Sequence, residues 1–174
     1  GRRTTAEPAP PLEVPDGEWV ATLATSWVEP AYLETDASWC SPGGEPAGVL
    51  ANGGAFGAKS DSPLPAVARR LADGHGRTVL ALWSREDTVN HGSKRPPVSI
   101  GIDSDGSGIM RVVATPGINR AVARVAPGLH VEEVEVKGPR TSAAIRCAGW
   151  AEAFCALVAV GIDGPAGGRD DAAI

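Results

Sequence analysis

The chain has 174 residues, of which 43% are hydrophobic and 5% aromatic, so it can form a packed core built mainly from aliphatic side chains. The formal net charge is −5 and the basic residues are scattered, which excludes the concentrated basic surface that a nucleic-acid partner needs. The apolar run 148–160 is too short for a membrane span, so no membrane partner is expected. Three cysteines without paired spacing indicate a reducing, cytoplasmic location.

Composition divides the chain into three parts. Residues 1–17 are rich in proline among small and charged residues, which is typical of an extended arm or linker. Residues 161–174 are rich in Gly and Asp and are expected to form a flexible tail. Residues 18–160 between them are expected to form a single domain.

The first half of this domain predicts strands around one helix. Residues 18–27 have two fairly apolar faces and predict a buried strand, and a second strand is expected at 31–39. A short apolar strand is expected at 47–51 and a buried strand at 78–83. A helix is expected at about 63–73, since its apolar residues recur at helical spacing.

The second half predicts a hairpin and two further helices. Residues 98–102 and 109–113 flank an Asp-Gly turn, as the two strands of a hairpin do. A helix should begin at Thr115-Pro116, followed by a half-exposed strand at 129–136 and a last helix over 142–160. The mixed order leaves α/β open, and we expect an α+β fold with a mixed β-sheet and packed helices.

The positions of two cysteines provide a test of the last predicted helix. In a helix over 142–160, Cys147 and Cys155 would share one face with Cα atoms roughly 12 Å apart, beyond the disulfide reach of about 7 Å. Both are therefore expected to be free and packed.

The most informative stretch is the glycine-rich run that ends at Lys59. Glycines permit positive φ and a close approach of backbone to a ligand, and backbone amides in such a loop can bind an anion. The run lacks a contiguous Gly-Lys-Ser/Thr and the G-x-G-x-x-G spacing, so neither familiar phosphate motif is present. A tight structural turn and a ligand-binding cradle both remain open.

Other polar clusters favour structural roles. Asp103 and Asp105 match the start of a calcium-binding loop, but Ala114 stands where a bidentate carboxylate is required, so a hairpin turn is favoured. The segment Lys94-Arg95 is interpreted as a solvated loop.

The histidines offer no clear site. His75 and His91 are expected in exposed loops, and no histidine has a partner at metal-ligand spacing, so no metal ligand is predicted. A Ser-His-Asp triad stays open, although no G-x-S-x-G motif announces one, and no catalytic residue is assigned.

Several motifs occur in one order along the chain. The run Gly53–Lys59 is similar to the G-G-x-F-G-G-K loop of molybdenum hydroxylases, the xanthine dehydrogenase and aldehyde oxidase family. The segment Ser84–Asp87 is similar to the family's T/S-R-E-E/D motif, and the Asp-Gly hairpin follows a basic, Pro-containing loop. Upstream, Glu29–Thr35 is similar to the family's H-x-x-M/L-E-P segment. The resemblance covers residues 18–114.

The resemblance implies a fold similar to part of the molybdopterin-binding domain in the family's large subunit. It implies that Gly53, Gly54, Phe56 and Gly57 contact a molybdopterin (molybdenum) cofactor and that Lys59 supports the loop. It also implies Fe–S and flavin subunits of a molybdenum hydroxylase as partners, with self-association as an alternative.

The chain also departs from the family pattern. It contains no Gln, whereas the family has a Gln-containing segment before the glycine loop, and no segment matches the family's catalytic Glu. We therefore expect a cofactor-binding fragment or subunit of such an oxidoreductase, a truncated homologue that is incomplete on its own. The alternatives are a non-catalytic binding or assembly protein derived from the fold, or a small repurposed enzyme that needs no cofactor.

Overall fold

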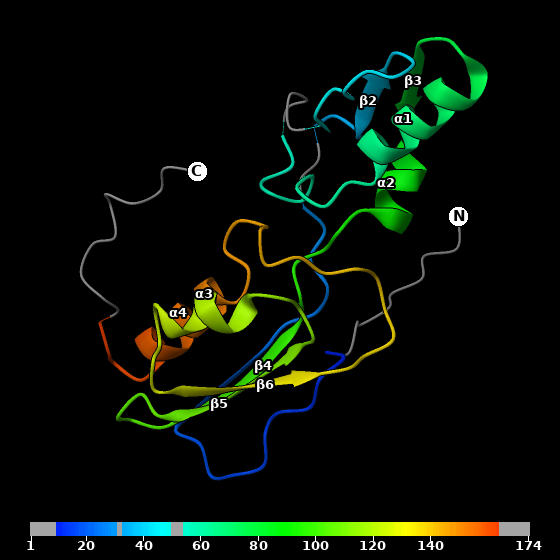
Figure 1. Ribbon diagram of the computed structural model, residues 1–174. Coiled ribbons are helices and arrows are strands. Elements are labelled where there is room, and N and C mark those ends of the chain that lie inside the picture. Colours follow the sequence, from blue (N-terminus) through cyan, green and yellow to red (C-terminus); the bar gives the residue numbers. More distant parts are fainter. Residues whose placement is uncertain (1–9, 31–32, 50–53, 164–174) are drawn as a thin grey trace, which may run out of the picture. The chain divides into compact units, whose positions relative to one another are not determined.

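The computed structural model describes residues 10–30, 33–49 and 54–163 (Figure 1). The chain divides into two units, each made of separate stretches of sequence. Unit 1 comprises Gly1–Val28, Pro96–Val136 and Cys147–Ile174, and unit 2 comprises Glu29–Arg95 and Lys137–Arg146. The predicted single domain over 18–160 thus includes residues of both units, and its boundaries stay a prediction.

Unit 1 is built on a mixed four-stranded sheet. Its strands, in spatial order, are β1 (Ala21–Ala24), β4 (Val98–Ile102), β5 (Gly108–Val113) and β6 (Leu129–Val134). The pairs β1–β4 and β4–β5 are antiparallel, whereas β5 and β6 are parallel and are joined through helix α3 (Ile118–Ala123). Helix α4 (Trp150–Ala159) completes the unit. The chain is therefore α+β, with a mixed sheet and packed helices, as the sequence predicts.

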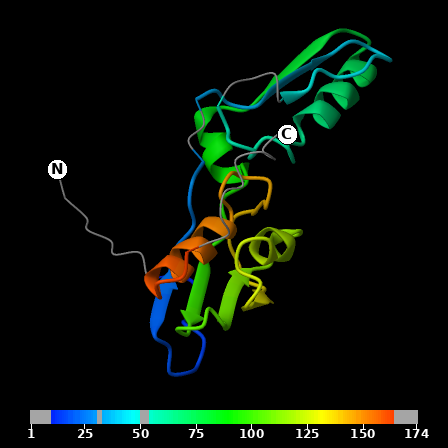
Figure 2. The same ribbon diagram turned by 90° about the vertical axis from the view of Figure 1, so that its left-hand side faces the viewer.

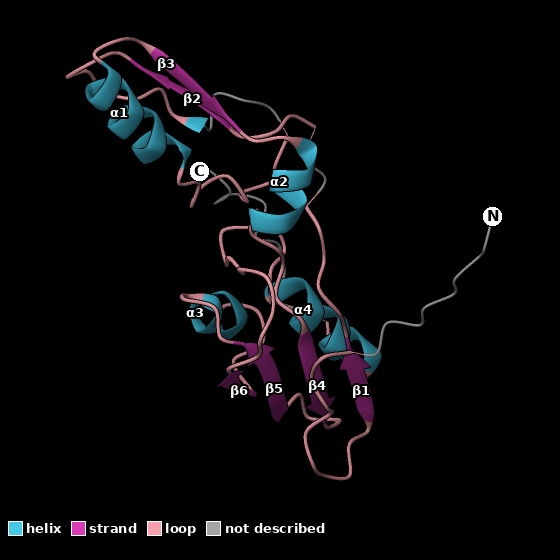
Figure 3. Ribbon diagram, turned by 90° about the vertical axis from the view of Figure 1, so that its right-hand side faces the viewer, coloured by secondary structure: helices cyan, strands magenta, loops and turns pink. Residues whose placement is uncertain are grey.

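Strand β4 of this sheet is covered on both faces. Helices α3 and α4 lie on the same side of the sheet (Figures 1 and 3). Ile100, Met110 and Ile118 are fully buried in the core of this unit. Because neighbouring residues of a strand face opposite sides, Gly101 faces away from Ile100, and the indole of Trp19 lies against it. All residues of β4 are consequently buried.

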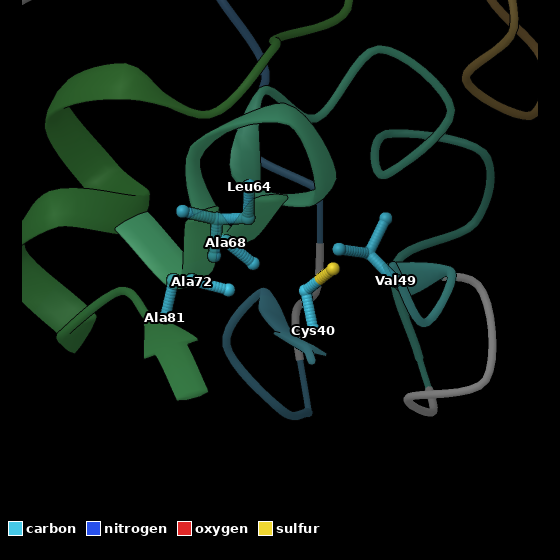
Figure 4. Close-up of a cluster of buried hydrophobic side chains, with 6 residues drawn as sticks. All are labelled: Cys40, Val49, Leu64, Ala68, Ala72 and Ala81. Carbon is cyan, nitrogen blue, oxygen red and sulfur yellow. The ribbon is translucent and has the colours of Figure 1, made fainter. Parts of the chain in front are cut away.

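Unit 2 contains an antiparallel ribbon of β2 (Ala37–Cys40) and β3 (Val79–Leu82), with helix α1 (Leu64–His75) along it (Figure 2). Helix α2 (Arg85–His91) follows the ribbon. The core of the unit consists of the buried side chains of Cys40, Val49, Leu64, Ala68, Ala72 and Ala81 (Figure 4). Since three of these residues are alanines, the backbone of α1 can pack closely on the ribbon.

The outer face of the ribbon is exposed and apolar. Trp39, Leu80 and Leu82 are 53%, 60% and 59% exposed. Trp39 lies directly opposite Leu80 in the register, so their side chains share one face, and Leu82 lies two residues further along it. The strand expected at 78–83 is present, but the prediction that it is buried is wrong, because only one face packs on α1.

The other predicted elements can be compared one by one. Helix 63–73 is confirmed as α1, and the hairpin, the helix after Thr115 and the strand within 129–136 are confirmed as β4–β5, α3 and β6. The first strand is shorter and more exposed than predicted. Residues 47–49 form no strand, and 50–51 lie outside the described residues.

The prediction of a last helix over 142–160 is wrong at its start. Cys147 and Gly149 have φ angles of 70° and 74°, which interrupt a right-handed helix, and α4 begins only at Trp150. Cys147 therefore does not share a helix face with Cys155. Both are free, but Cys155 is exposed rather than packed.

One further local expectation is corrected. His75 and His91 are not loop residues, because they are the last residues of α1 and α2, where a histidine interacts favourably with the helix dipole. In the described part of residues 1–17, Leu12 and Pro15 are buried, and the assignment of an arm or linker stays a prediction. The tail beyond Asp163 lies outside the described residues. No helix in the described ranges is both long and apolar enough to cross a membrane.

Candidate cofactor-binding site

The glycine loop, defined here as residues 54–61, leads into α1 through successive turns. The turn bonds run from the amides of Ala58, Ser60 and Ser62 to the carbonyls of Ala55, Gly57 and Lys59, at 2.9, 3.2 and 3.1 Å. The first residue of the predicted cofactor-contacting set, Gly53, lies outside the described residues.

Gly57 occupies a position that only glycine fits. Its φ is 95°, and a Cβ atom built on it would lie 1.9 Å from the carbonyl oxygen of Ala144. Gly54 also has a left-handed φ of 70°, and a Cβ there would meet the side chain of Leu33 at 2.6 Å. The close approach at Gly57 is therefore made by the chain's own backbone, which gives this glycine a structural reason independent of any ligand.

At residues 54–57 of the glycine loop, the backbone carbonyls are hydrogen-bonded, whereas the backbone amides have no acceptor among the described residues. The carbonyls of Gly54, Ala55, Phe56 and Gly57 accept hydrogen bonds from the amides of Leu33, Ala58, Arg146 and Ser60 at 3.0, 2.9, 2.7 and 3.2 Å. The amides of residues 54–57 donate to none of the described residues. The four carbonyl oxygens therefore accept hydrogen bonds within unit 2. The four backbone amides stay free to donate to solvent or to an anionic ligand.

A positive charge lies against the aromatic ring of this loop. The guanidinium carbon of Arg146 is 5.4 Å from the centroid of the Phe56 ring, a cation–π contact. Phe56 is 44% exposed, and its φ of 50° is uncommon for a residue with a large side chain. Together these two side chains form an exposed, flat and cationic patch at the loop.

Lys59 lies in the interior of the protein. It is only 2% exposed and is among the largest fully buried side chains. An ammonium buried to this extent does not face solvent or a surface ligand. Its predicted role as a support of the loop stays a prediction.

The neighbouring Lys94 is not a solvated loop residue, which corrects the sequence interpretation. Its Nζ atom lies 2.6 Å from Oε2 of Glu29 and donates to the carbonyl of Thr88 at 3.4 Å, and the lysine side chain is 7% exposed. Burial of a lysine is costly unless it is paired, and Glu29 provides the countercharge.

A segment from the C-terminal half, residues 137–146, completes this part of unit 2; we call it the returning segment. Its backbone exchanges hydrogen bonds with Lys94, and Nη2 of Arg140 donates to the carbonyl of Asp61 at 3.2 Å. Arg146 and Ala144 contact the glycine loop. Sequence reasoning missed this segment because no local pattern signals such a distant contact.

The Asp103–Ser107 turn has a structural role. Ser107 donates from its amide and its hydroxyl to Oδ1 of Asp105 at 2.9 and 2.6 Å, and these bonds lower the pKa of Asp105. Within the described ranges, no group of three or more His, Cys, Asp and Glu side chains could hold a metal ion.

Helix α2 was not predicted, although the sequence carries a signal for its N-terminus. The Ser84 hydroxyl accepts from the Asp87 amide at 3.0 Å, and the Asp87 carboxylate accepts from the Ser84 amide at 2.9 Å, forming a capping box. The hydrogen bonds from the Ser84 backbone and hydroxyl, with attraction to His91, lower the pKa of Asp87. The spacing Ser-x-x-Asp, interpreted only as a family motif, marks this helix start.

The comparisons with known proteins identify no family for this chain. No family model and no curated protein matches the sequence. Among solved structures, the chain is similar to an aldehyde oxidoreductase from Desulfovibrio gigas, with 15% identity and a TM-score of 0.48 over 83% of this chain and 23% of that one. It is also similar to quinoline 2-oxidoreductase from Pseudomonas putida 86, with 13% identity and a TM-score of 0.43 over 83% of this chain. This chain covers 27% of that protein, so it spans about a quarter of both.

Proposed function

We propose that the chain is a molybdopterin-binding fragment or subunit of an oxidoreductase of the xanthine dehydrogenase and aldehyde oxidase type. The observation that carries the proposal is that the backbone amides of residues 54–57 in the glycine loop have no hydrogen-bond acceptor among the described residues, whereas their carbonyls are bonded inside unit 2. The Arg146 guanidinium lies over the Phe56 ring of the same loop. Backbone donors and a guanidinium suit the phosphate of an anionic pterin cofactor.

The residues fit such a group in their donor chemistry. The amides of Gly54, Phe56 and Gly57 would hold the anionic part, with Gly53 preceding them in the chain, and Lys59 would stabilise the loop from inside. When bound, the molybdenum cofactor supplies the redox chemistry of substrate hydroxylation. The role of this chain is to bind and orient it.

This chain would not enclose the cofactor alone. Two cavities in unit 2 are lined by other residues and include none of Gly54–Gly57. Cofactor sites usually bury most of the ligand surface, so further protein must cover this loop. We propose that other subunits of a molybdenum hydroxylase, with Fe–S and flavin groups, provide that cover.

The test measures pterin and molybdenum in the full chain purified from a host that makes the cofactor. Bound pterin should fall severalfold in Arg146→Gln and remain in Arg124→Gln, a matched exposed arginine of unit 1. Phe56→Gly removes the ring while permitting the left-handed φ, and it should also weaken retention. A folded wild-type chain that retains no pterin after reconstitution would refute the proposal.

The same preparation tests whether this chain alone is sufficient for catalysis. Because no segment of this sequence matches the family's catalytic Glu, the reconstituted chain should not hydroxylate hypoxanthine or aldehydes with an artificial electron acceptor. Turnover above background that disappears in Phe56→Gly would show that the chain is sufficient for catalysis.

A second candidate is a non-catalytic assembly protein, which the outer face of the β2–β3 ribbon favours. Trp39, Leu80 and Leu82 place three large apolar side chains side by side in solvent. We propose that a second copy of the chain covers this face in a two-fold pair. Sedimentation should show a dimer that Leu80→Asp dissociates and Val89→Asp, at another exposed position of unit 2, does not. A wild-type monomer at high concentration would refute it.

A further inference from the structure

A second concave site lies in unit 2, away from the glycine loop. It is a cavity of about 440 Å³ between the end of α2, the start of α1 and the returning segment. Its walls are Pro63, Trp83 and Pro139, and its polar groups are Asn90, His91 and Arg140. This volume falls within the range of about 300–1,000 Å³ that is usual for small-molecule sites.

The apolar walls suit a flat ring. The indole of Trp83 and the imidazole of His91 have centroids 6.2 Å apart with their planes inclined at 48°. The two prolines of the lining, Pro63 and Pro139, have rigid rings and offer no hydrogen-bond donor from their backbone nitrogen. A planar aromatic group can therefore pack against Trp83 with little loss of side-chain freedom in the protein.

The polar groups suit an anion. Arg140 is oriented by the bond from its Nη2 atom to the Asp61 carbonyl at 3.2 Å, which uses one of the five guanidinium donors. His91 and Asn90 add further donors, and none of the lining residues is acidic. The nearby Asp87 carboxylate is held in the capping box by Ser84. The cavity therefore combines a cationic fork with an aromatic wall.

We propose that this cavity binds a small aromatic anion, a planar ring that carries a carboxylate or a phosphate. The ring packs against Trp83, and the anionic group pairs with Arg140 and accepts from His91 or Asn90. The site is separate from the proposed cofactor loop, because none of Gly54–Gly57 lines it. The two proposals can therefore fail independently.

The experiment follows the indole N–H signal of Trp83 by nuclear magnetic resonance in the full chain, with Trp83→Phe used to assign it. Benzoate, phenyl phosphate and the neutral analogue benzyl alcohol are titrated separately. We expect a saturable shift with at least one anion and a much weaker one with benzyl alcohol. The stronger of the two anions identifies the preferred headgroup.

Matched variants locate the binding. Arg140→Gln should lower the affinity for the preferred anion by about tenfold, as expected for loss of a charge-assisted pair. Arg120→Gln on α3 should leave that affinity unchanged. Since Arg140 also bonds Asp61, His91→Gln provides a second variant that leaves that bond in place and should weaken binding severalfold. The proposal is overturned if neither anion gives a saturable shift, if benzyl alcohol binds as well, or if both variants bind as the wild type does.

Discussion

The two sheets of this protein are made of similar residues but have different surroundings. In unit 1, β4 is buried along its whole length, with α4 packed on one face and Trp19 against the other. In unit 2, the β2–β3 ribbon packs on α1 through one face and leaves the large side chains of the other face in solvent. Apolar composition alone therefore does not determine whether a strand belongs to the core.

The ribbon also reverses the usual relation between side-chain size and burial. Ala81 faces α1, whereas its neighbours Leu80 and Leu82 face outward. Ala68 and Ala72 of the helix meet the ribbon from the other side. Small residues at this interface permit a short helix–strand distance, so most of the large apolar surface of β3 contributes little to folding.

The sharpest test compares the same kind of truncation in the two sheets. Ile100→Ala in β4 should lower the free energy of unfolding by about 2–5 kcal/mol, because it leaves a cavity in the core. At protein concentrations where the chain is a monomer, Leu80 is exposed, so Leu80→Ala in β3 should change the free energy of unfolding by no more than about 0.5 kcal/mol. Urea unfolding of both variants measures the difference. Similar losses would mean that the ribbon's outer face is buried in solution.

The next largest effect is expected at the glycine loop of unit 2. Gly57→Ala places a Cβ against the Ala144 carbonyl at a left-handed φ, and should cost about 3 kcal/mol. Gly74→Ala is the matched control, because a Cβ there meets nothing within 4 Å and its φ is not left-handed. Thermal unfolding should separate the two variants clearly. Equal stability would show that the loop and the returning segment do not touch.

A smaller loss of stability is expected from a substitution at the start of α2. Ser84→Ala removes the capping hydroxyl and should lower stability by about 1 kcal/mol in chemical unfolding. Ser104→Ala, at a turn position where no side-chain bond is described, serves as the control. A neutral Ser84→Ala variant would mean that α2 is held by packing alone.

The pH dependence of this cap has a defined sign. The pKa of Asp87 is lowered from its usual 3.8 by its bonds to Ser84, so its contribution to stability is present above about pH 4 and is lost as pH falls through the lowered pKa. Asp87→Asn should therefore flatten part of the acid side of the stability curve. An unchanged slope would contradict the cap's role in acid unfolding.

The smallest expected effect is on the rate of cysteine modification, and it differs between the two units. Cys40 is buried in the core of unit 2, and Cys155 is exposed on α4 of unit 1. A thiol reagent should therefore modify Cys155 rapidly and Cys40 only on unfolding. The variant Cys155→Ser should lose the fast phase. Rapid modification of Cys40 in the native protein would show that the α1–ribbon core opens readily.

Elements with local signals were predictable, and elements that depend on distant partners were not. The apolar spacing of α1 and the Asp-Gly hairpin between β4 and β5 follow from neighbouring residues alone. The start of α4 was misplaced because the left-handed φ of Cys147 has no sequence signature and the signal of Gly149 was missed. The exposure of Leu80 depends on which face α1 covers, and a run of apolar residues cannot show this.

The candidate site was predictable in part for the same reason. The glycine run located the loop, and its motif resemblance suggested a ligand. The Ala144 carbonyl that explains Gly57, and the guanidinium of Arg146 beside Phe56, come from the returning segment. Pairs so far apart in sequence leave no periodicity in either stretch, so one sequence alone does not reveal them.

The order of the segments also constrains the folding of the chain during synthesis. Because residues 137–146 belong to unit 2, the glycine loop emerges from the ribosome long before the residues that fix it. The hydrogen bond from the Arg146 amide to the Phe56 carbonyl can form only after β4, β5 and β6 have been synthesised. Long-range contacts of this kind slow folding. A nascent chain arrested before residue 137 would therefore carry the loop without the backbone that holds Gly57 in place.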